Sequence, residues 1–233
     1  MQVIDVSAGS GFTWIKQAFA MFLARPGSWI SLASMWFLVT IGCLFIPAIG
    51  PAIMIMIQPA LFAGFVLAAR EQAEDRPFTV AQLFGGFRFN GRALVTLGSI
   101  TLLTELVVVF FLDLLGFPRI TFAANGLPDM PALAKAMEGK TWLLFTGFGL
   151  LVLIKGVLWF ATPLLATHDM RPGHALRWTF YAFIANLLPL FMFGVLMMVI
   201  FFIGTLTWGL GLLVAFPIYA IAHFTSYRQV FRD

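Results

Sequence analysis

Two stretches of the chain carry no charged residue over lengths that a soluble fold does not tolerate. They run from Pro26 to Ala69 and from Trp178 to Tyr227. A helix needs about 20 apolar residues to cross a hydrocarbon core about 30 Å thick, so each stretch is long enough for two crossings. Hydrophobic residues make up 61% of the chain and charged residues only 10%, against roughly 25% charged in soluble domains. The sequence therefore predicts a multi-pass membrane protein and excludes the soluble, disordered, collagen and coiled-coil classes.

Turn signals divide these stretches into hairpins. Prolines and a glycine over 47–51 interrupt the first stretch, and a glycine-rich sequence over 204–211 interrupts the second. Two further apolar runs lie between them, and none of the runs shows the alternation that a transmembrane β-barrel requires. We predict an all-α polytopic membrane protein with six transmembrane helices as three hairpins, at about 28–46, 51–69, 94–115, 141–164, 186–203 and 209–225.

A short aromatic-rich segment precedes each predicted hairpin. The three segments cover residues 12–22, 79–87 and 175–184. In the first, Phe12, Ile15 and Phe19 recur at helical spacing and share one face. Short amphipathic helices with few, basic charges lie along a membrane surface. We therefore predict that each hairpin is preceded by a short interfacial amphipathic helix.

The basic residues predict the orientation. Ten of them lie on the side that holds both termini and the loops 70–93 and 164–178, namely Lys16, Arg25, Arg70, Arg76, Arg88, Arg92, Arg171, Arg177, Arg228 and Arg232. Three lie on the other side, all in the long segment 116–140: Arg119, Lys135 and Lys140. Because cytoplasmic loops are rich in Lys and Arg, we predict a protein of the inner (cytoplasmic) membrane with both termini in the cytoplasm.

The hairpins share a pattern that indicates internal repeats. In each, a late proline is followed 11 residues later by a basic residue or histidine; the pairs are Pro59 and Arg70, Pro163 and His174, and Pro217 and Arg228. We predict a single transmembrane domain over 1–233 with pseudo-repeats at about 10–70, 78–168 and 173–230. The alternative is that membrane hairpins look alike without being repeats, because proline and glycine are common in transmembrane helices.

Three groups of motifs carry a resemblance to a known family. They are Pro59–Gly64 with Arg76–Phe78 and Leu83–Phe87, Thr162–Ala166 with Ala175–Arg177, and Gly209–Gly211 with Phe216–Tyr219. Together they resemble the YciC-like superfamily of bacterial multi-pass inner-membrane proteins, most closely a proteobacterial branch without assigned function. The membrane domain of some glycerophosphoryl diester phosphodiesterases is similar. The resemblance covers about residues 10–230 and implies a six-helix inner-membrane fold, but no catalytic residues.

Two ionisable residues lie deep inside predicted spans. Counted from the cytoplasmic ends, Glu105 is about eleven residues deep and Lys155 about nine, so at about 1.5 Å per residue their depths differ by a few ångströms. A lone charge at the bilayer centre costs at least about 2.5–3.5 kcal/mol, so we predict an intramembrane polar pair. The role of the pair stays open. It could form a site for a substrate, protons or a headgroup, or it could be a structural ion pair. A further alternative is that Lys155 snorkels to an interface.

Residues that could support catalysis or metal binding form no recognised pattern. His168, Asp169, His174 and His223 lie near the cytoplasmic side, but without the spacing of a zinc site. The single cysteine, Cys43, excludes an internal disulfide. There is no nucleophile elbow, phosphate-binding loop or dinucleotide-binding motif. We predict no catalytic residues, no metal, no cofactor and no enzymatic activity.

Arginines among aromatic residues mark the cytoplasmic face. The predicted contacts to lipid headgroups are Arg70, Arg76, Arg88, Arg92, Arg171, Arg177 and Arg228. Topology alone would also produce such a face, and both interpretations stay open. The net charge of +4 is attributed to topology, so nucleic acid is not an expected partner. Membrane lipids are the expected partners, with a homo-oligomer or a larger membrane complex left open.

The sequence therefore favours a non-enzymatic integral inner-membrane protein with a lipid-interacting or membrane-organising role. The first alternative is a small transporter or permease for a small or amphipathic solute, since prolines interrupt several of the predicted spans, as in discontinuous transport helices. A weaker alternative is a subunit of a larger membrane complex. A polar cavity that reaches Glu105 and Lys155 would favour transport.

Overall fold

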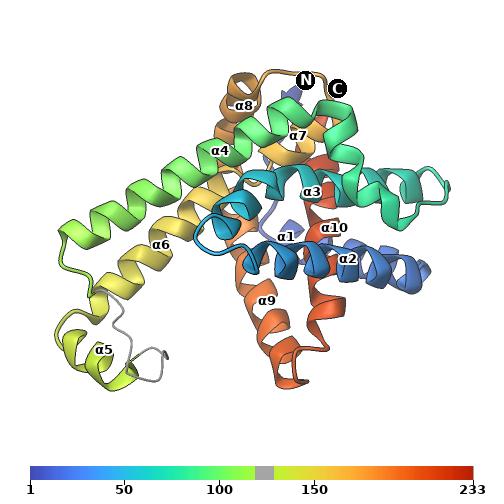
Figure 1. The fold of residues 1–233 in the computed structure, drawn as a ribbon. Helices are drawn as coiled ribbons and strands as arrows, with labels where there is room; N and C mark the ends of the chain where they lie inside the picture. The colour runs from blue at the N-terminus through green and yellow to red at the C-terminus, as the bar shows by residue number, and fades with distance from the viewer. Residues whose placement is uncertain (119–128, 233) are drawn as a thin grey trace. The chain divides into compact units, whose positions relative to one another are not determined.

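The computed structural model describes residues 1–118 and 129–232, and these form two compact units. The first unit comprises residues 1–99 with 157–233, and the second comprises residues 100–156. The predicted outer-side residue Arg119, and part of the predicted outer segment 116–140, lie outside the described residues. Figure 1 shows the elements of each unit along the chain.

Helices account for nearly all of the regular structure among the described residues. They are α1 (Ser10–Ala24), α2 (Pro26–Leu44), α3 (Gly50–Ala73), the 3-10 helix η1 (Val80–Phe84), α4 (Gly85–Leu114), α5 (Met130–Ala136), α6 (Thr141–Val157), α7 (Ala161–Thr167), α8 (Pro172–Ala185), α9 (Leu187–Leu206) and α10 (Leu212–Val230). Two short strands, β1 (Gln2–Val3) and β2 (Phe231–Arg232), complete the fold. The all-α class is confirmed.

Five helical segments of the described chain are long and apolar enough to cross a membrane. They span Pro26–Leu44, Gly50–Ala73, Val80–Leu114, Thr141–Thr167 and Leu187–Leu206, which correspond to the first five predicted spans. The sixth predicted span, about 209–225, overlaps α10 from residue 212 on, and α10 is not among the five. A multi-pass architecture is confirmed, whereas the count of six and the hairpin layout stay predictions.

Three proline-containing helices meet at the centre of the first unit. Pro59 of α3, Pro163 of α7 and Pro217 of α10 are all buried, and each of the three helices packs against the other two. Each segment that precedes a predicted hairpin packs on one of them: α1 on α10, η1 on α3 and α8 on α7. The segments before the second and third predicted hairpins thus pack on the proline-containing helix of the preceding hairpin, and the segment before the first hairpin packs on that of the third, so the contacts are cyclic. The internal repeats stay a prediction.

The middle pre-hairpin segment differs from the other two. Residues 12–22 and 175–184 lie within α1 and α8, as expected, whereas residues 80–87 form the 3-10 helix η1 and the first residues of α4. This segment passes close to α3, because a Cβ on Gly86 would contact the carbonyl oxygen of Ala60. A kink at Asn90, where φ is −145°, separates this segment from the rest of α4, which thus consists of two helices. A short helix ahead of the span is therefore present here too, and its amphipathic, interfacial character stays a prediction.

Aromatic rings fill the core of the first unit. The rings of Trp36 and Phe216 have centroids 4.1 Å apart, and Phe62 packs on Phe216 at 5.6 Å. Trp159 stacks on His223 with centroids 3.5 Å apart. Pairs of this kind contribute about 0.5–1.5 kcal/mol each beyond the area they bury. They join α2, α3 and α10 to the segment between α6 and α7.

Residues near the two ends of the chain pair with each other in the first unit (Figure 1). Strands β1 and β2 are antiparallel, with Gln2 opposite Arg232 and Val3 opposite Phe231. The fully buried Asn186 fixes the segment after β1, because its Oδ1 accepts the Val6 N–H at 3.0 Å and its Nδ2 donates to the Ile4 carbonyl at 3.1 Å. Residues 2–6 and 230–232 are therefore held on the same side of this unit.

The second unit contains the later half of α4, together with α5 and most of α6. Helices α4 and α6 approach closely at Gly147, where an added Cβ would lie 2.7 Å from Leu112 Cδ1. Lys140 donates from Nζ to the Gly116 carbonyl at 3.1 Å. Helix α5 begins after Asp129, whose side chain accepts the Ala132 N–H at 3.0 Å and so caps the helix.

Candidate functional site

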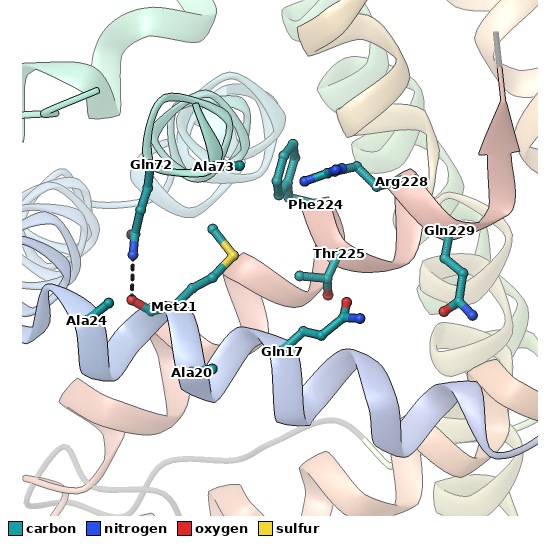
Figure 2. Close-up of a pocket in the computed structure, with 10 residues that line it drawn as sticks. All are labelled: Gln17, Ala20, Met21, Ala24, Gln72, Ala73, Phe224, Thr225, Arg228 and Gln229. Carbon is teal, nitrogen blue, oxygen red and sulfur yellow. Dashed lines mark hydrogen bonds between the residues drawn. The ribbon is translucent and has the colours of Figure 1, made fainter. Parts of the chain in front are cut away.

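A pocket of about 620 Å³ opens in the first unit between α1, the end of α3 and the end of α10. Figure 2 shows its walls. The lining residues come from the three helices in turn: Gln17, Ala20, Met21, Ala24, Gln72, Ala73, Phe224, Thr225, Arg228 and Gln229. Both α3 and α10 end at this pocket, each near a basic residue that the orientation rule places on the cytoplasmic side.

Helical spacing explains why α1 forms one wall of the pocket. Gln17, Ala20, Met21 and Ala24 follow an i, i+3, i+4, i+7 pattern and share one face. Trp14, one turn before Gln17 and at the edge of the same face, is fully buried, and α1 packs against α9 and α10. Because the side chains of the alanines are small, they leave the volume between the helices open.

Two of the glutamines that line the pocket have their amides engaged. Gln72 accepts a hydrogen bond from the Trp29 indole N–H at 2.8 Å and donates to the Met21 carbonyl at 2.8 Å. Gln229 accepts from the Trp14 indole N–H at 2.6 Å and donates to the Ser10 hydroxyl at 3.2 Å. These amides brace α3 and α10 against α1 and its neighbour α2.

Arg228 and Gln17 are the polar lining residues with donors to spare. The guanidinium of Arg228 lies 5.5 Å from the centre of the Phe224 ring, which is a cation–π distance. Within residues 1–118 and 129–232, Arg228 forms no ion pair with a carboxylate. Both side chains are exposed. The pocket therefore offers an uncompensated positive charge and an amide N–H to a ligand.

The predicted headgroup residues Arg70 and Arg76 are already paired. Arg70 contacts Glu74 at 3.1 Å, Arg76 contacts Glu71 at 2.5 Å, and Arg76 also forms an ion pair with Glu74. The hydrogen bond from Arg70 lowers the pKa of the Glu74 carboxyl, and the hydrogen bond to Glu71 raises the pKa of Arg76. In this cluster the charges of two arginines are balanced by those of two glutamates, so the cluster attracts an anionic headgroup only weakly.

The remaining predicted headgroup residues are exposed and not balanced in this way. Arg88, Arg92 and Arg171 form no ion pair among the described residues, and Arg177 lies over the Tyr181 ring at 5.8 Å. Arg88 and Arg92 lie on α4 just before and just after its kink, Arg171 precedes α8, and Arg177 lies within α8. Their positive charge is available to anions at the surface.

The structure brings Glu105 and Lys155 together within the second unit. Lys155 Nζ lies 2.5 Å from Glu105 Oε1, linking α4 to α6. The side chain of Glu105 is 19% exposed and that of Lys155 is 47% exposed. Neither residue lines the pocket between α1, α3 and α10. Whether this pair supports a function or only the fold stays open.

His223 and His168 have different surroundings, and His174 is exposed on α8. His223 is buried and stacked on Trp159, whereas His168 lies 3.0 Å from the Thr167 hydroxyl and 3.3 Å from that of Tyr227. Over the part of the chain that the structure describes, no three His, Cys, Asp or Glu residues are grouped so that they could hold a metal ion.

Sequence reasoning missed the pocket and named only Arg228 among its residues. The available signal was a glutamine in each of three otherwise apolar segments near their cytoplasmic ends: Gln17, Gln72 and Gln229. Glutamine forms no motif of its own. Its role here depends on which helices meet, and helix packing is not visible in a single sequence.

One protein of known sequence is similar over most of the chain. A probable inner membrane protein of Burkholderia thailandensis is 29% identical over 195 residues, which cover 76% of this chain and 67% of the relative. This chain is a multi-pass integral membrane protein. This conclusion rests on the apolar helices of membrane-spanning length, and the relative supports the predicted inner-membrane location. No family model matches the chain, and no solved structure matches it.

Proposed function

We propose that this chain is a non-enzymatic, six-helix protein of the bacterial inner membrane that binds anionic lipids along its cytoplasmic surface. The observation that carries the proposal is the set of exposed arginines that form no ion pair among the described residues on the predicted cytoplasmic side, Arg88, Arg92 and Arg171. The pocket beside α1, with the uncompensated charge of Arg228 at its wall, adds to the positive charge of that side. Basic residues at the cytoplasmic leaflet attract anionic lipids, by about 1 kcal/mol each.

Helix α1 has the features of a helix that lies at a membrane surface. Phe12, Phe19 and Leu23 are exposed and lie 7 and 4 residues apart, so they form one apolar stripe. Lys16 lies on the same face, and its long side chain can reach the headgroups. An interfacial helix buries such a stripe at the boundary of headgroups and acyl chains. The neighbouring pocket face of α1 is then at headgroup level.

The paired strands support an even number of crossings. Since β1 and β2 are hydrogen-bonded to each other, residues 2–3 and 231–232 belong on the same side of the membrane. The five most apolar helices alone would place them on opposite sides. A crossing by α10 makes the number of crossings even. Because most of α10 is buried in the first unit, it needs less apolar surface than a helix that faces lipid. The excess of basic residues makes that shared side cytoplasmic.

Family resemblance and the relative agree with this assignment. The motifs over residues 10–230 resemble the YciC-like superfamily, whose members are bacterial multi-pass inner-membrane proteins. The Burkholderia thailandensis relative carries the description of a probable inner membrane protein. Membership of the superfamily, and the absence of catalysis, are part of the proposal.

A small transporter is the second candidate because of one observation. The ion pair of Glu105 and Lys155 joins two membrane-length segments well away from their ends, and intramembrane ion pairs of this kind mark many substrate and proton pathways. The two functions make different demands on the pair. Transport requires it for a cellular phenotype, whereas a lipid-binding role requires it only for stability.

Lipid retention tests the proposal. The full-length chain is purified from membranes that contain phosphatidylethanolamine and phosphatidylglycerol, and the retained lipids are identified by native mass spectrometry. We expect phosphatidylglycerol to be enriched over its share of the membrane. Replacing Arg88 and Arg92 by glutamine should reduce the enrichment, whereas the matched loss of two outer charges, Lys135→Gln with Lys140→Gln, should not. Retention in proportion to membrane composition would contradict the proposal.

A further inference from the structure

We propose that the pocket between α1, α3 and α10 is a specific site for one anionic phospholipid, with Arg228 and Gln17 binding its phosphodiester group. This inference rests on the proposed lipid-binding function and adds to it a place, a ligand class and a stoichiometry. It differs from a general attraction of lipids to a basic surface, because it requires the shape and the donors of this one pocket.

The donors of the pocket suit a phosphodiester. Arg228 supplies a planar fork of N–H groups that can bind two phosphate oxygens at once. Gln17, on the facing wall, supplies an amide N–H from α1 (Figure 2). The amides of Gln72 and Gln229 are already committed to Trp29 and Trp14. The lining therefore presents donors to a ligand while its other polar groups hold the walls in place.

The charge of the lining selects among lipids. Among the described residues that line the pocket, Arg228 is the one charged residue and none is a carboxylate. One positive charge balances the single negative charge of phosphatidylglycerol. The ammonium of phosphatidylethanolamine would find no carboxylate partner among the described lining residues, and it would lie near the like charge of Arg228. The site should therefore prefer phosphatidylglycerol to phosphatidylethanolamine and phosphatidylcholine.

The size and the apolar lining of the pocket suit the polar end of a lipid. Its volume of about 620 Å³ lies within the range of roughly 300–1,000 Å³ that is usual for small-ligand pockets. That volume accommodates a headgroup and a glycerol backbone but not two long acyl chains. Ala20, Ala24, Ala73 and Phe224 provide apolar contacts for the glycerol. The acyl chains would leave along α1, where Phe19 and Leu23 are exposed.

The side chain of Arg228 is already restricted in conformation before a ligand binds. Its guanidinium lies over the Phe224 ring, one helical turn earlier on α10. Stacking on an aromatic ring restricts the side chain without using its N–H groups, so less conformational freedom is lost when the ligand binds. A lysine at this position would keep the charge but lose the planar fork.

Titration of the full-length protein in a neutral detergent tests the site. Short-chain dihexanoyl phosphatidylglycerol is the probe, and isothermal titration calorimetry gives affinity and stoichiometry. We expect one site per chain, and a loss of about tenfold or more in affinity for Arg228→Gln, because a hydrogen bond to a charged group is removed. Ala24→Trp, which fills the pocket without changing charge, should also abolish binding. Lys135→Gln, which removes one charge from the opposite side, should bind like the unmodified chain.

The other arms separate the site from its alternatives. Glycerol 1-phosphate, which carries the phosphate without acyl chains, should bind much more weakly than the lipid; equal affinity would identify a soluble phosphate ester as the ligand and overturn the lipid assignment. If Arg228→Gln and Arg88→Gln weaken binding equally and Ala24→Trp has no effect, lipids bind diffusely, and the site is refuted while the proposed function stands. Equal affinity for dihexanoyl phosphatidylcholine refutes the selectivity for anionic lipid. Circular dichroism confirms that each variant is folded.

Discussion

At the scale of single residues, Glu105 and Lys155 each depend on the other for a charge partner. We predict that Glu105→Gln or Lys155→Met alone destabilises the protein more than the two changes together, because a single change leaves one charge without its partner. Loss of one partner of a buried pair costs about 3–5 kcal/mol in soluble proteins. The partial exposure of this pair should reduce that cost, so the ordering is the prediction. A double-mutant cycle of thermal unfolding in detergent measures it, and additive losses would contradict coupling.

Gly64 provides a second test at this scale. A Cβ at this position would lie 2.3 Å from the Leu83 carbonyl oxygen, so Gly64→Ala should force η1 away from α3 and cost about 1–3 kcal/mol. Gly194 is the matched control, since it also lies inside a long helix but has nothing within 4 Å of an added Cβ. Gly194→Ala should be neutral or slightly stabilising. Equal melting temperatures for the two variants would show that η1 does not pack this closely.

Contacts between single residues could be predicted where they follow from the position of a charged residue along a predicted span. The approach of Glu105 to Lys155 followed from counting residues inward along two spans, which needs no knowledge of packing. The ion pairs of Arg70 and Arg76 were not predicted, although Glu71 and Glu74 are close in sequence. The pairs of Arg76 depend on the turn after α3, where Asp75 has a φ of +56°, whereas Arg70 and Glu74 have the i, i+4 spacing of a helix, so that pair was open to prediction. Local backbone geometry of this kind is not encoded in charge counts.

At the scale of elements, α10 is the helix whose role in the membrane most needs a test. We predict that it crosses the bilayer, so that the turn before it is external while β2 is cytoplasmic. In a chain with Cys43 replaced by alanine, a cysteine at Leu210, which is highly exposed in that turn, should react with an impermeant thiol reagent in intact spheroplasts.

Cysteine substitution of His174 gives the matched internal control. His174 is exposed and lies in the loop 164–178, which we predict to be cytoplasmic, so it should react only after the membrane is permeabilised. Protection of the position 210 cysteine in intact spheroplasts would contradict a crossing by α10, and with it the count of six.

Helix positions followed from the sequence better than helix contacts did. The first predicted span, about 28–46, lies within two residues of α2 at each end, because charges and turn signals bound the apolar runs. The sequence did not distinguish the 3-10 geometry of η1 from an α-helix, and it did not show the close approach of Gly86 to α3. The cyclic packing of α1, η1 and α8 on three proline helices could be suspected from repeated motifs but not deduced from them, since contacts between distant segments leave no trace in one sequence.

At the scale of the whole molecule, the pairing of β1 with β2 closes the cyclic order of packed segments in the first unit. We predict that Asn186→Ala loosens this closure, because it leaves the Val6 N–H and the Ile4 carbonyl without their partner. Each buried polar group left unpaired costs about 1–3 kcal/mol. Thermal unfolding and limited proteolysis near residues 2–8 measure the effect.

Thr96→Ala is the control for this change. It removes an exposed hydroxyl that bonds only to the Arg92 carbonyl in its own helix, so it should leave both melting and proteolysis nearly unchanged. If Asn186→Ala behaves like this control, the paired segments do not contribute to closure, and the argument for an even number of crossings weakens.

The most direct measurement of the central claim is the melting temperature of the purified chain, titrated with phosphatidylglycerol and, separately, with phosphatidylcholine in the same detergent. A ligand that binds only the folded state stabilises it by mass action, by about 2.7 kcal/mol at 100 times its dissociation constant. We predict a saturable rise with phosphatidylglycerol, a much smaller rise for Arg228→Gln, and little change with phosphatidylcholine. Equal shifts with the two lipids, or no shift with either, would contradict the claim that this membrane protein binds anionic lipid at its cytoplasmic face.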